Sequence, residues 1–165
     1  MLFLLFDLDG ERYALDARDV AQVLPLVPVR PFPGTPPWIA GVIDHAGGPV
    51  PVIDLAMLAL GRPSSAFMST RLVLVYDRRA GEGVCARFVA LLLEHATRTA
   101  SFDESAFVEG GIATPDARWL GPVARDKYEG GDFVQWVKVD QLIDARVRAL
   151  LFPDPPSWQG EGAAS

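Results

Sequence analysis

Six prolines lie within the thirteen residues from position 25 to position 37, and they constrain the fold of this chain more than any other feature. Each proline ring removes a backbone donor and clashes with the preceding helical turn, so no helix can cross this segment. Two apolar runs follow, at 38–43 and 50–53, with Gly47 and Gly48 between them. Their lengths and the glycines predict two short strands joined by a tight turn.

The second of these strands leads directly into a short helix. Pro51 within it favours an edge position or the start of a strand, because proline cannot donate to a ladder. Asp54 is placed to cap a helix over 55–60, and Gly61 is placed to end it.

Upstream of the prolines, the sequence predicts a hairpin and then a helix. The apolar runs 2–8 and 12–15 are separated by Asp9-Gly10, a strong hairpin signal. Asp16 is placed as an N-cap, and the spacing of Val20, Val23 and Leu24 at i, i+3 and i+4 predicts one apolar stripe of a helix that ends before Pro25.

Downstream of the capped helix, the pattern is again mostly β. We expect a buried strand over 71–76, two consecutive strands over 84–96 with a break near Glu94, an edge element over 120–123 and a strand over 133–139. Asp140 is placed to cap a last helix over 141–151. No internal repeat is evident. Many short strands with few short helices indicate a mainly β fold of small-barrel type.

Composition narrows the class of protein. The 165 residues fit one domain, and 21 acidic against 15 basic residues give a net charge of −6, which disfavours nucleic acid as a partner. A single cysteine cannot form an internal disulfide, as expected in a reducing compartment. The longest apolar runs are too short for a membrane span, so we expect a soluble, cytoplasmic protein without membrane insertion. The proline- and glycine-rich residues 153–165 are expected to form a flexible tail.

The residues that could carry chemistry do not form an active site by sequence. Cys85 lies in an apolar run, where a free cysteine is usually inert. His95 ends that run, and we expect its imidazole to form a hydrogen bond with a neighbouring residue. Asp44 and His45 are adjacent and point to opposite faces of a strand, so they make a poor metal site. We therefore predict neither an enzyme nor a bound metal or cofactor.

The central motif resembles the CheW-like domain of bacterial chemotaxis coupling proteins. The matching positions are Pro33, Gly34, Pro36, Ile39, Gly41, Val42, Gly47, Val50, Pro51, Val52, Ile53, Asp54 and Leu55. The likeness extends over roughly residues 2 to 152. It implies two intertwined, five-stranded SH3-like β-barrel subdomains with a few short helices in a domain over 1–152. It also implies a non-catalytic adaptor that links a CheA-type histidine kinase, through its regulatory domain, to chemoreceptor cytoplasmic tips.

The resemblance also implies a partner-binding surface in two parts, and both depart from the family pattern. Where the family has Val-x-Glu-[Val/Ile], this chain has Val20, Ala21, Gln22 and Val23. Where the family has Asn-Leu-Arg-Gly, it has Asp44, His45, Ala46 and Gly47.

The lost arginine would remove a guanidinium from an exposed turn. Three explanations stay open: His45 substitutes in part, the receptor tip has diverged, or receptors are not contacted there. A small-ligand sensor that uses the cleft between the barrels is the alternative function.

Overall fold

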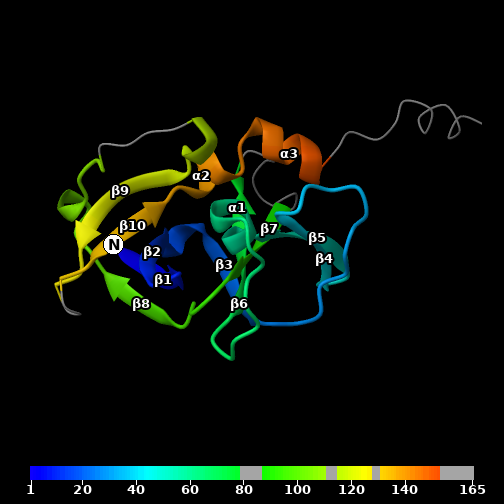
Figure 1. Ribbon diagram of the computed structural model, residues 1–165, viewed down its shortest axis with the longest axis horizontal. Helices are drawn as coiled ribbons and strands as arrows, with labels where there is room; N and C mark the ends of the chain where they lie inside the picture. Colours follow the sequence, from blue (N-terminus) through cyan, green and yellow to red (C-terminus); the bar gives the residue numbers. More distant parts are fainter. Residues whose placement is uncertain (79–86, 111–114, 128–130, 153–165) are drawn as a thin grey trace, which may run out of the picture.

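The fold consists of two five-stranded sheets with short helices at their junction (Figure 1). The computed structural model describes residues 1–78, 87–110, 115–127 and 131–152. The strands are β1 (Leu2–Leu8), β2 (Glu11–Asp16), β3 (Val20–Pro25), β4 (Ile39–His45), β5 (Gly48–Asp54), β6 (Arg71–Asp77), β7 (Arg87–Leu93), β8 (Arg98–Ser101), β9 (Leu120–Arg125) and β10 (Phe133–Val137). The helices are α1 (Leu55–Leu60), α2 (Val139–Leu142) and α3 (Ala145–Leu151), with 3₁₀ turns at Ala17–Asp19, Glu104–Ala106 and Pro115–Ala117.

The two sheets have the same internal arrangement. The first has the strand order β8-β1-β2-β10-β9, and the second has β3-β6-β7-β5-β4. In both, successive pairs are antiparallel, antiparallel, parallel and antiparallel. The mainly β class is confirmed. The strand ladders leave each sheet open. In each sheet, an isolated antiparallel bridge connects the segment that follows one edge strand to the edge strand on the opposite side: the segment after β8 to β9 in the first sheet, and the segment after β3 to β4 in the second.

The buried apolar side chains form a central cluster to which both sheets contribute and a further cluster on each sheet. On β6, Val73 and Val75 join a central cluster to which both sheets contribute, whereas Leu72 and Leu74 join a cluster of the second sheet alone. Successive strand residues point to opposite faces, so a strand buried on both faces reads as a continuous apolar run. This explains the run at 71–76.

Several local predictions are confirmed by the caps and turns. The Asp54 side chain accepts a hydrogen bond from the Met57 N–H at the start of α1, and Gly61 ends that helix at φ 73°. Asp9 and Gly10 form the β1–β2 turn with positive φ. The strand break after β7 falls at Glu94 and His95, as expected, and His95 has φ 53°. The next strand, β8, begins only at Arg98, beyond the span 84–96 that was expected to hold both strands.

Three predictions of local structure were wrong. Residues 20–24 form no helix: they belong to strand β3, which pairs with β6 and leaves only a 3₁₀ turn after Asp16. The expected last helix is divided in two, and Asp144 rather than Asp140 caps the longer part by accepting from the Val147 N–H. Pro51 was expected at an edge or at the start of a strand, but it lies within the inner strand β5. It is tolerated there because the pairing of β5 with β7 begins only at the next residue, Val52.

The helices of the described residues are short. None is long and apolar enough to cross a membrane. Cys85 and the tail at 153–165 lie outside the described residues.

Candidate partner-binding surface

The two predicted parts of the surface lie on the two edge strands of the second sheet. Val20, Gln22 and Val23 are on β3, and the segment Asp44–Gly47 ends β4 and forms the β4–β5 turn. Strands β6, β7 and β5 separate the edges within the sheet. The structure therefore places both parts on one sheet without joining them into one continuous cluster.

The β3 edge presents apolar side chains to solvent. Val23 is 43% exposed, and Leu26 and Val27 just beyond the strand are 38% and 37% exposed. Gln22 is also exposed, whereas Val20 is partly buried against the central cluster. Leu26 and Val27, which sequence reasoning did not select, extend the candidate surface beyond Pro25.

An ion pair marks the entry to β3. Asp19 in the preceding 3₁₀ turn lies 3.3 Å from the Arg78 guanidinium, which also donates to the Arg18 carbonyl. Burial raises the pKa of the Asp19 carboxyl, and the attraction of Arg78 opposes that rise. The pair fixes the start of β3 to the end of β6.

The β4–β5 turn is a two-residue hairpin loop. His45 pairs with Gly48, and the intervening Ala46 and Gly47 have φ values of 52° and 81°. Two successive positive φ values are the requirement of a type I′ turn, which favours Asn-Gly. Both loop residues are exposed, and Ala46 carries only a methyl group in a conformation that disfavours side chains.

A residue that sequence reasoning missed, Arg30, lies beside this turn. Its N–H and C=O both bond to Val42 of β4, each at 2.9 Å. Gly41 makes this approach possible: it has φ +142°, and a Cβ built there would lie 1.9 Å from the Arg30 carbonyl oxygen. The motif glycine therefore allows the proline-rich segment to lie close beside β4.

An open groove of about 370 Å³ runs between that segment and the turn. Its lining residues are Pro28, Arg30, Val42, Ile43, Asp44, Gly47, Gly48 and Pro49. Sequence reasoning missed Arg30 because its close backbone contact with Gly41 becomes visible only in the folded structure.

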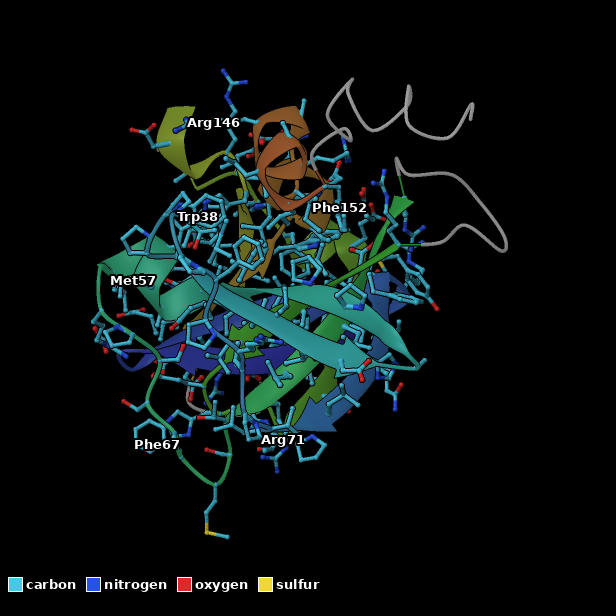
Figure 2. The ribbon with its side chains drawn as sticks, turned by 90° about the vertical axis from the view of Figure 1, so that its right-hand side faces the viewer. Trp38, Met57, Phe67, Arg71, Arg146 and Phe152 are labelled. Carbon is cyan, nitrogen blue, oxygen red and sulfur yellow. The ribbon has the colours of Figure 1, made fainter. Side chains whose placement is uncertain are left out.

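A second hollow, of about 260 Å³, lies between the two sheets. Trp38 and Leu58 line it from the second sheet's side, and Trp119 and Leu142 from the first. These are equivalent positions, because the Trp38 carbonyl accepts from the Asp54 N–H at 2.8 Å and the Trp119 carbonyl from the Lys138 N–H at 2.7 Å. Figure 2 shows Trp38 beneath Arg146 of α3, which also lines the hollow.

The histidine near the end of β7 has structural contacts. His95 Nδ1 lies 2.8 Å from the Ser69 hydroxyl, and its ring stacks on Phe67 at 4.8 Å. The preceding Glu94 is buried and receives two hydrogen bonds of 2.9 Å from Arg62. Within the described ranges, no group of three or more His, Cys, Asp or Glu side chains is arranged to hold a metal.

Comparison with known proteins identifies both the family and the fold. The family model of the CheW-like domain matches residues 2–147. No curated protein matches the chain. Among solved structures, the scaffolding protein TtCheW from Thermoanaerobacter tengcongensis superposes with a TM-score of 0.70 at 22% identity, over 87% of each chain. At that identity, the superposition establishes a shared fold.

Proposed function

Because the chain belongs to the CheW-like domain family, we propose that it is a non-catalytic coupling protein that links a CheA-type histidine kinase to chemoreceptor cytoplasmic tips. Residues 1–152 form the coupling unit in this proposal, and the tail at 153–165 is dispensable for it. Both partners act in the cytoplasm, which is where we place the protein.

The observation that carries the proposal is the exposed apolar edge of the second sheet. Val23 on the edge strand β3, and Leu26 and Val27 just beyond it, remain substantially exposed, although nearby residues of the same sheet are buried. Apolar side chains at the centre of a polar surface are typical anchors of protein interfaces. An edge strand also offers unpaired backbone groups to a partner.

Isothermal titration against the regulatory domain of the CheA-type kinase encoded nearest to this protein tests the proposal. We expect micromolar or tighter binding that Val23→Glu weakens by about tenfold or more, because the change places a charge in the buried centre of the contact. Val108→Glu is the matched control, since Val108 is 61% exposed and lies on the first sheet, where it bridges to Val123 of β9. No binding at high protein concentration would refute the kinase partnership.

The hollow between the sheets supports a second candidate, a small-ligand sensor. Two tryptophans and two leucines from equivalent positions give it an apolar lining, with charged side chains around them. A metabolite that raises the melting temperature of the wild type but not of Trp38→Ala would favour this function.

A further inference from the structure

We propose that Arg30 is the cationic anchor of the coupling surface, where its guanidinium binds a carboxylate of the kinase regulatory domain beside the β4–β5 turn. The inference rests on the coupling function proposed above.

The backbone of Arg30 is held in place before any partner arrives. Both of its polar backbone groups bond to Val42, and the contact depends on the bare Cα of Gly41. Pro31 follows directly and restricts the conformations open to Arg30. A side chain on a fixed backbone loses less entropy when it binds than one on a mobile loop.

The side chain, by contrast, is uncommitted. In the part of the chain that the structure describes, the Arg30 guanidinium makes no hydrogen bond or ion pair. The arginines at 62 and 148 instead pair with the buried carboxylates of Glu94 and Asp77. Arg30 is exposed, so its five donors remain available to a carboxylate from outside.

The groove beside Arg30 leaves room for that carboxylate. Gly47 and Gly48 contribute no side chains to its wall, and Pro28 and Pro49 supply apolar sides. Asp44 also lines the groove, but it forms no ion pair with Arg30 among the described contacts. Among the described residues that line the groove, Arg30 is the one cation, so it is the group there that would attract a carboxylate.

The test compares arginine variants in titrations against the same kinase regulatory domain. We expect Arg30→Ala to weaken binding about tenfold and Arg30→Glu about a hundredfold, with Arg30→Lys in between because a lysine keeps the charge but not the planar fork. The wild-type affinity should fall as salt is raised, and Arg30→Ala should reduce that dependence. Lys127→Ala and Lys127→Glu are the matched controls: Lys127 is an exposed cation just after β9 of the first sheet and has no described partner, so we expect changes within about twofold.

The outcomes separate this inference from the coupling function. If the wild type fails to bind the kinase domain, the kinase arm of the proposed function falls, and the inference falls with it. If the wild type binds and Val23→Glu weakens it while Arg30→Glu does not, only the inference is overturned. Arg30→Ala should also melt within about 2 °C of the wild type. A larger loss would show that the guanidinium has a structural contact and would contradict the proposal.

Discussion

Replacing Gly41 with alanine tests the close approach of the proline-rich segment to β4 that places Arg30 beside the turn. The new methyl group would begin 1.9 Å from the Arg30 carbonyl oxygen and 2.7 Å from its carbonyl carbon, both of them backbone atoms. Real Cβ contacts are rarely shorter than about 3 Å, so the segment around Arg30 must move by about 1 Å. Such a shift breaks or distorts the two hydrogen bonds between Arg30 and Val42.

The expected cost follows from these contacts. Two backbone hydrogen bonds contribute about 1 kcal/mol each, and a left-handed backbone conformation costs an L-residue about 1–2 kcal/mol. We therefore expect Gly41→Ala to lower the free energy of unfolding by about 3–4 kcal/mol. For a domain of this size, that loss corresponds to a melting temperature lower by about 10 °C.

Gly34→Ala is the matched control for Gly41→Ala. Gly34 also has a positive φ, of 79°, but nothing lies within 4 Å of a Cβ built there. The Gly34→Ala variant therefore measures the cost of a positive φ without a steric clash, about 1 kcal/mol of the free energy of unfolding. Urea denaturation followed by circular dichroism measures both variants. If Gly41→Ala is no less stable than Gly34→Ala, the close approach does not constrain the segment and the reasoning is refuted.

Two further changes test other contacts. Arg62→Met removes the partner of the buried Glu94. Hydrogen bonds from Arg62 are the largest cause that lowers the pKa of Glu94. The pair therefore stabilises the protein at neutral pH, and that stabilisation is lost as the pH falls through the lowered pKa. The urea midpoint of Arg62→Met should therefore lie below that of the wild type at pH 7, with a gap that narrows below about pH 4; a gap independent of pH would contradict the ionic explanation. Ala46→Asn should raise the free energy of unfolding by about 0.5–1 kcal/mol in the same urea assay, because asparagine tolerates the φ of 52° at this turn position; a loss of stability would argue against the type I′ turn.

Much of the fold could be predicted because its signals are local. Asp54 caps a helix and Gly61 ends it through atoms only a few residues away, so the sequence contains the whole interaction. The Asp9-Gly10 turn is of the same kind. The apolar strands β6 and β7 could be recognised because burial on both faces removes polar residues from the run. The motif order in the same sequence also identified the family.

Other features were decided by tertiary contacts. Val20, Val23 and Leu24 fit an apolar helical stripe as well as a strand, and it was the edge of β6 that supplied hydrogen bonds to an extended chain. The shared strand order of the two sheets cannot be read from residues, because the chain passes from the first sheet to the second and back.

For the candidate surface, the sequence by itself determined the turn residues from 44 to 47 and showed that no arginine is among them. Only the tertiary structure decided that Arg30 lies beside that turn. The reason is a contact between backbones eleven residues apart, at Gly41 and Arg30, which exists only when the proline-rich segment folds back beside β4.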